Sequence, residues 1–124
     1  MTASSAGGPW LGLDIGGTKL LAVCVDGDAR VRAEARLPTR REAGADAVLA
    51  RCVDLIAPLR ERHRPRGLGV GFAGLVDGRR GVARSSIMLP GFEEFPLAAR
   101  LAAAMDLPVC IDNDANTAAL AELA

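Results

Sequence analysis

Histidine, cysteine and lysine are all scarce in this sequence, and each shortage limits what the protein can be. His63 is the only histidine, and no CxxC pair occurs among the three cysteines, Cys24, Cys52 and Cys110. A structural zinc site needs a cluster of such ligands, so we interpret the cysteines as reduced thiols packed in the core of a cytoplasmic protein. Lys19 is the only lysine among 15 basic residues, and it stands beside the most glycine-rich turn.

The chain also lacks an excess of either charge and any long apolar run. Fifteen basic residues balance fifteen acidic ones, which argues against nucleic acid or an anionic membrane as a partner held by charge. No segment approaches the length of a membrane span, and the start, MTASSAGGP, lacks the charged and apolar parts of a signal peptide. We therefore expect a cytoplasmic protein in which residues 1–9 are a flexible tail.

The chain contains enough apolar residues to form the core of one domain. The chain has 124 residues, half of them apolar, which suffices for a single hydrophobic core. Short apolar or alternating segments predict strands over 10–15, 20–25, 30–37, 67–73 and 108–111. Helical spacing predicts helices over 43–63, where Pro58 would kink or shorten the helix, over 96–105, and from about residue 114.

The order βββαβαβα predicts an α/β fold with a mixed sheet flanked by helices. A turn is expected at 26–28, and residues 74–84 are predicted to form a hairpin or a loop. The last predicted helix runs into Ala124 without a glycine cap or a breaker. This ending predicts that a longer protein continues beyond it.

The clearest motif is LGLDIGGTK at 11–19. Gly16 and Gly17 follow a buried strand, where two residues without side chains let backbone N–H groups approach an anion. Thr18 adds a hydroxyl and Lys19 a positive charge, while Asp14 offers oxygen ligands that suit a hydrated magnesium ion. A plain hairpin with a glycine turn is the alternative interpretation.

A second polar group, CIDNDAN at 110–116, follows an apolar strand. Ligands of open α/β folds bind at the carboxyl edge of the sheet, where this group is expected. Asp114 could accept the proton of a sugar hydroxyl, and the Asn113 amide could bind sugar hydroxyls. The alternative is that one of Asp112, Asn113 and Asp114 caps the following helix, a role that is compatible with the first.

DIGGTK at 14–19 and NDAN at 113–116 together resemble the ROK family of repressors, open reading frames and kinases. GVGFAGLVDG at 69–78 and LPGFEEFPLAARLAAAMDLPV at 89–109 also resemble segments of that family. The four motifs occur in the family's order, and the resemblance covers residues 11–124. Residues 10–124 are therefore identified as the N-terminal lobe of a ROK-type sugar kinase.

The resemblance implies a ribonuclease-H-like lobe of the actin-like ATPase superfamily, which binds ATP and Mg²⁺ in a cleft and phosphorylates glucose or an N-acetylhexosamine. It implies that the ATP phosphates are bound by Gly16, Gly17, Thr18 and Lys19, and that magnesium is bound by Asp14 through water. The resemblance further implies that the sugar is bound by Asn113, Asp114 and, through its backbone, Gly74. Asp114 takes the role of general base. The second lobe, which carries the family's structural zinc, is absent, and a homodimer is implied only for the full-length protein.

The sequence departs from the family pattern at three positions. Met88 stands where the family usually has asparagine, Phe92 replaces a common tryptophan, and Asp112 replaces a glutamate. The loss of a polar group at Met88 leaves the identity of the sugar open. The alternative to an enzyme is a sugar-binding or regulatory ROK module without turnover, but only about ten residues precede the first strand, too few for a DNA-binding domain.

Overall fold

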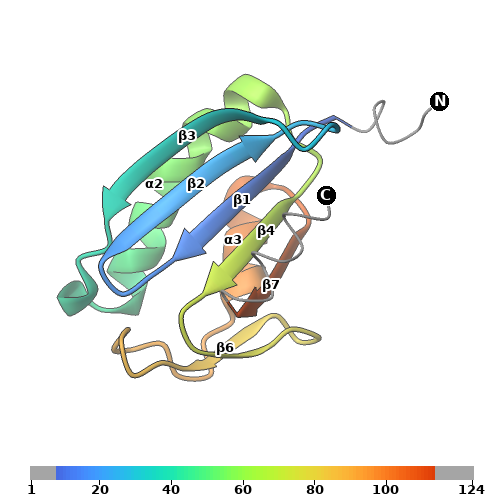
Figure 1. Cartoon of the computed structure of the whole chain (residues 1–124). Coiled ribbons are helices and arrows are strands. Elements are labelled where there is room, and N and C mark those ends of the chain that lie inside the picture. The colour runs from blue at the N-terminus through green and yellow to red at the C-terminus, as the bar shows by residue number, and fades with distance from the viewer. Residues whose placement is uncertain (1–7, 114–124) are drawn as a thin grey trace.

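Five strands form one mixed sheet in the computed structural model, which describes residues 8–113 (Figure 1). The strands are β1 (Trp10–Ile15), β2 (Lys19–Val25), β3 (Val31–Pro38), β4 (Leu68–Phe72) and β7 (Val109–Asn113). Their order across the sheet is β3-β2-β1-β4-β7. The first three strands are antiparallel, whereas β4 and β7 run parallel to β1. This confirms the predicted α/β class with a mixed sheet.

Two helices, α2 (Ala45–His63) and α3 (Leu97–Met105), cover one face of this sheet (Figure 1). A 3₁₀ turn, η1 (Arg41–Ala43), leads into α2. Helix α2 packs against β1, β2 and β3, and α3 packs against β7 and α2. Pro58 is exposed and does not end α2, which continues to His63.

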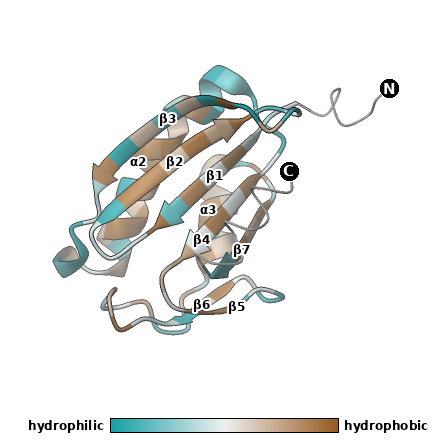
Figure 2. Ribbon diagram, viewed as in Figure 1, coloured by the Kyte–Doolittle hydropathy of each residue, from teal (hydrophilic) through white to brown (hydrophobic). Residues whose placement is uncertain are grey.

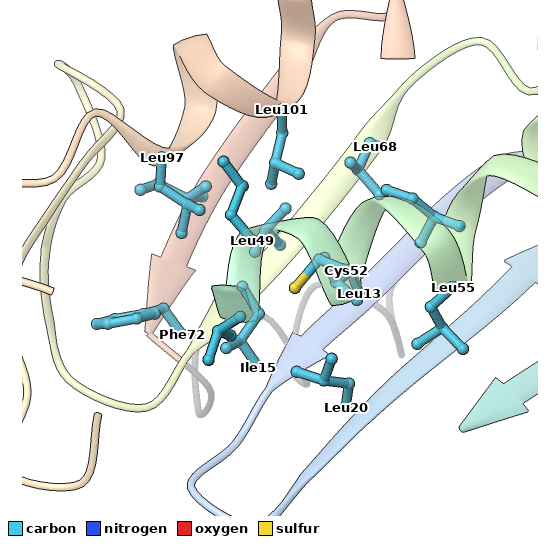
Figure 3. Close-up of a cluster of buried hydrophobic side chains, with 14 of the residues drawn as sticks. Leu13, Ile15, Leu20, Leu49, Cys52, Leu55, Leu68, Phe72, Leu97 and Leu101 are labelled. Atoms are coloured by element: carbon cyan, nitrogen blue, oxygen red, sulfur yellow. The ribbon is translucent and has the colours of Figure 1, made fainter. Parts of the chain in front are cut away.

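The core lies between the helices and the sheet because alternate strand residues point to that side. Leu11, Leu13 and Ile15 of β1 are buried there, and their cross-strand partners on β4 are Leu68, Val70 and Phe72. Figure 3 shows Cys52 and Leu49 of α2 facing these strands. The hydropathy colours in Figure 2 show hydrophobic residues along the central strands.

Two features around the sheet extend the sequence prediction. A hairpin of β5 (Leu75–Asp77) and β6 (Val82–Ser85) follows β4, where a hairpin or loop was expected. Strand β7 continues to Asn113 instead of ending at residue 111, because Asp112 and Asn113 pair in register with β4. The predicted helix from residue 114 and residues 1–7 of the predicted tail lie outside the described residues.

One prediction about the cysteines is wrong. Cys24 and Cys52 are buried, but Cys110 is exposed. It precedes Ile111 on β7, and since neighbouring strand residues face opposite sides, Cys110 points away from the core that buries Ile111. Within residues 8–113, no helix is both long enough and apolar enough to cross a membrane.

Candidate functional site

Three parallel strands end together at one edge of the sheet. Ile15, Phe72 and Asn113 are the last residues of β1, β4 and β7, and they lie in register across the sheet. The glycine turn predicted from the sequence follows Ile15, and the segment that contains Gly74 follows Phe72. The fold therefore gathers the predicted phosphate turn, the Gly74 segment and Asn113 at the edge where open α/β sheets bind ligands.

The turn between β1 and β2 is held by Thr39, a residue that the sequence analysis did not identify. Thr39 is the only fully buried polar residue in the described part of the chain, with 0% exposure. Its hydroxyl donates a hydrogen bond of 2.7 Å to the carbonyl oxygen of Gly16, and its amide donates one of 2.9 Å to the carbonyl oxygen of Thr18. These two bonds tie the carbonyl groups of the turn back toward β3.

Two of the amide groups in the same turn have no acceptor in the described residues. Gly16 donates to the carbonyl oxygen of Lys19 at 3.1 Å, but the amides of Gly17 and Thr18 donate to no acceptor in residues 8–113. Thr18 and Lys19 are exposed, and Lys19 has no carboxylate partner in that part of the chain. Successive free N–H groups beside a lysine are the features that bind a phosphate group.

A loop packs closely over the glycine at the second position of this turn. A Cβ atom on Gly17 would lie 2.5 Å from the terminal methyl carbon of Met88. The Met88 loop is held in turn by Ser86, whose hydroxyl donates to the carbonyl oxygen of Ala73 at 2.6 Å and accepts the amide of Met88 at 3.1 Å. Met88, noted above as a departure from the family pattern, thus lies directly against the predicted phosphate turn.

Gly74 is closely packed as well. A Cβ atom there would lie 2.3 Å from the carbonyl oxygen of Ser85, a distance that no other residue type could accept without a backbone shift. Its amide donates to the carbonyl oxygen of Phe72 at 2.9 Å. This amide is therefore engaged within the protein, and a contact from Gly74 to a sugar would have to use its carbonyl group.

Two carboxylates flank a glycine on the other face of the sheet. Asp14, Gly71 and Asp112 are aligned in register on β1, β4 and β7, so the two aspartates stand two strand spacings apart, roughly 10 Å. Because Gly71 has no side chain, nothing on β4 separates them at this position. Asp14 is exposed and Asp112 is half-buried, with its Oδ1 accepting the amide of Asn113 at 2.8 Å.

The predicted general base, Asp114, lies outside the described residues. Its neighbour Asn113 is exposed at the end of β7, next to Phe72 of β4. The sequence analysis missed the alignment of Asp112 with Asp14 because it depends on the strand register, and it missed Thr39 because no local pattern distinguishes it. The run CIDND was the only sequence signal for Asp112.

The residues at this edge fit a phosphate group and a hydrated cation. Two free amides, a hydroxyl and a lysine side chain surround the turn, and Asp14 provides the oxygen atoms that Mg²⁺ prefers. Asn113 provides a donor and an acceptor at the neighbouring strand end. This arrangement can hold a phosphorylated ligand beside a polar second ligand.

Known proteins resemble this chain in both sequence and fold. The chain is 39% identical over 114 residues to an N-acetyl-D-glucosamine kinase of Citrobacter koseri, covering 91% of this chain and 37% of that protein. The structure of a ROK family glucokinase from Streptomyces griseus in complex with glucose and AMPPNP matches with a TM-score of 0.83 and 31% identity, over 90% of this chain and 35% of that chain. A ROK hexokinase from Thermus thermophilus matches with a TM-score of 0.81 and 37% identity, over 92% of this chain and 38% of that chain.

The chain thus spans little more than a third of the length of these relatives. The family profile described as "ROK family" matches residues 10–124. Its start coincides with the first residue of β1, so it covers every strand and helix described above. The chain belongs to the ROK family.

Proposed function

We propose that this chain is the N-terminal portion of an ATP-dependent sugar kinase that transfers the γ-phosphate of ATP to a hydroxyl of glucose or an N-acetylhexosamine. The observation that carries the proposal is the turn after β1, whose Gly17 and Thr18 amides are free while Thr39 restrains its carbonyl groups. The names of the related kinases support the same activity. Phosphoryl transfer depends mainly on positioning and charge stabilisation, which such a turn provides.

Each residue at the sheet edge has a role in this proposal. Bound ATP supplies the phosphoryl group and Mg²⁺ neutralises its charge. Within the chain, phosphate is held by Gly16, Gly17, Thr18 and Lys19, magnesium by Asp14 through water, and the sugar by Asn113 and the backbone of Gly74. Asp114 accepts the proton of the attacking sugar hydroxyl.

The general-base role is tested by Asp114→Asn in a completed enzyme. We suggest a chimera that joins residues 1–124 to the part of the T. thermophilus hexokinase beyond the matched region. With the unmodified chimera as the active reference, the Asn variant is expected to lose at least 100-fold in kcat, since a positioned base contributes about 10²–10⁴-fold. Sugar binding, measured by calorimetry, should largely survive because the amide retains hydrogen-bonding capacity.

The two measurements separate the enzyme from its alternative. A variant with near-normal kcat would show that Asp114 is not the base. An unmodified chimera that binds sugar but transfers no phosphate would favour the sugar-binding or regulatory module over the kinase. Zinc in a second lobe, a homodimer of the full-length protein and a cytoplasmic location stay predictions that rest on the family resemblance.

A further inference from the structure

A cavity lies at the end of the sheet opposite the phosphate turn. It has a volume of about 390 Å³ and is lined by Pro9, Asp26, Arg32, Arg62 and His63. Pro9 directly precedes β1 and the turn follows it, so the two sites are separated by the length of that six-residue strand, roughly 20 Å. The cavity volume is within the range that small-molecule sites occupy.

Two polar side chains of this cavity have no partner in the described part of the chain. Nε2 of His63 is shielded from solvent and makes no hydrogen bond there. Arg62, the preceding residue, forms no hydrogen bond or ion pair with any residue from 8 to 113. Buried polar atoms normally have partners, so the unpaired Nε2 of His63 is unusual. Arg62 is exposed, and its guanidinium group is free to bind a ligand from solvent.

The one carboxylate that lines the cavity already has partners within the chain. Asp26 Oδ1 accepts the amides of Asp28 at 2.9 Å and Arg30 at 3.0 Å, and Oδ2 pairs with Nε of Arg32 at 3.1 Å. The backbone hydrogen bond from Arg30 is the main reason that the pKa of Asp26 lies below its ordinary value. Asp26 therefore positions Arg32 at the cavity and leaves Arg62 and His63 without a counter-charge.

The walls of the cavity are fixed by backbone contacts. The amide of Arg66 donates to the carbonyl oxygen of Pro9 at 2.9 Å, and the amide of Arg64 caps α2 by donating to the carbonyl oxygen of Arg60 at 3.0 Å. The guanidinium group of Arg66 also stacks over Trp10 at 5.2 Å. Figure 2 shows hydrophilic residues at this end of α2.

The charges around the cavity specify the chemistry of the ligand. Arg32 and Arg62 exceed the single carboxylate by one positive charge, and the imidazole of His63 adds a further polar group. The planar guanidinium group matches the oxygen atoms of phosphate. The negative end of the α2 dipole, equivalent to about half an elementary charge, opposes an anion, but it is smaller than the excess of one positive charge.

We propose that this cavity binds the phosphate group of a small molecule, which Arg62 contacts directly while His63 lines the wall and Arg32 supplies a neighbouring charge. The cavity is separate from the phosphate turn, so the proposal does not depend on kinase activity. A phosphorylated metabolite bound there would contact α2 and the β2–β3 turn rather than the residues of the proposed transfer reaction.

The test is a titration of the ¹⁵N-labelled chain with inorganic phosphate at constant ionic strength, followed by NMR. We expect saturable shifts of the amides of residues 62–64 and 30–32, and at least tenfold weaker binding by a variant carrying Arg62→Gln and His63→Gln. Arg79→Gln, a change at an exposed arginine in the β5–β6 hairpin, is the matched control and should bind as the unmodified chain does.

A second arm distinguishes the sources of the phosphate group. Glucose 6-phosphate, with glucose as its control, should cause the same shifts, and tighter binding than inorganic phosphate would identify a phosphorylated sugar as the preferred ligand. Shifts confined to residues 16–19 would contradict the cavity and assign phosphate to the turn alone. Equal shifts with acetate, or shifts that do not saturate, would also overturn the proposal.

Discussion

At the scale of single residues, Thr39 links β3 to the predicted phosphate turn. It is completely buried, and its hydroxyl and amide bind the carbonyl oxygens of Gly16 and Thr18. Because both carbonyl groups are held by Thr39, the conformation of the turn is fixed without any bound ligand. Thr39 therefore acts as a positioning residue for the site.

Replacing Thr39 by valine removes the hydroxyl and keeps the shape of the side chain. The carbonyl oxygen of Gly16 then loses its partner, and we expect the free energy of unfolding to fall by about 1–3 kcal/mol. Urea unfolding of Thr39→Val and Thr39→Ser provides the comparison, since serine retains the hydroxyl. If the valine variant were at least as stable as the serine variant, the hydroxyl would not be what holds the turn.

At the scale of elements, α2 is the main cover of the sheet. Its buried side chains include Val48, Cys52 and Ile56, which recur at helical spacing on the helix that packs against β1, β2 and β3. Figure 3 shows Cys52 among the core side chains. The helix extends through Pro58 because tertiary packing on both sides of that residue outweighs the lost backbone hydrogen bond. Cys52, at the centre of this contact, is 0% exposed.

The buried thiol of Cys52 makes stability depend on alkaline pH. Burial raises its pKa from 9.0 to about 12, so between these values the unfolded chain releases a proton that the folded chain retains. The free energy of unfolding must then fall as pH rises through this window, by about 1 kcal/mol between pH 8 and pH 10. Urea unfolding at both pH values should show this loss in the unmodified chain and a smaller one in Cys52→Ala. The same pH dependence in both proteins would contradict the assignment.

At the scale of the whole molecule, the proposed ligand site lies at an exposed edge of the sheet. Thr18, Lys19 and Asn113 are all exposed at the edge of the sheet, and the chain covers only 37% of the related N-acetyl-D-glucosamine kinase. Phosphoryl transfer requires the ligands to be positioned together and water to be excluded.

We therefore predict that residues 1–124 alone have negligible kinase activity. Sugar phosphate formed from glucose or N-acetylglucosamine should stay at background with ATP and Mg²⁺, whereas the active chimera described above serves as the positive control. Sustained turnover by the purified chain would show that residues 1–124 contain a complete site.

Much of the fold could be predicted from local patterns. The alternation of apolar and polar residues in strands, and their helical spacing in helices, placed these elements to within a few residues, as for β1 and α3. This is possible because apolar residues recur within each segment with the period of its buried face. The glycine pair at 16–17 also predicted the tight turn between β1 and β2, since few other residues permit a close approach of the backbone. The ending of β7 was misjudged because Asp112 and Asn113 pair with β4, and pairing is a long-range interaction.

The sequence by itself determined the fold class and the family, and it indicated the segments that carry the proposed site. Only the tertiary structure decided that Thr39 restrains the phosphate turn, that Asp14 and Asp112 flank Gly71, and that Arg62 and His63 share a cavity with Asp26. Each of these depends on strand register or on contacts between distant segments. The local periodicity of apolar residues indicates which face of an element is buried. It does not indicate which residue of a distant segment contacts that face.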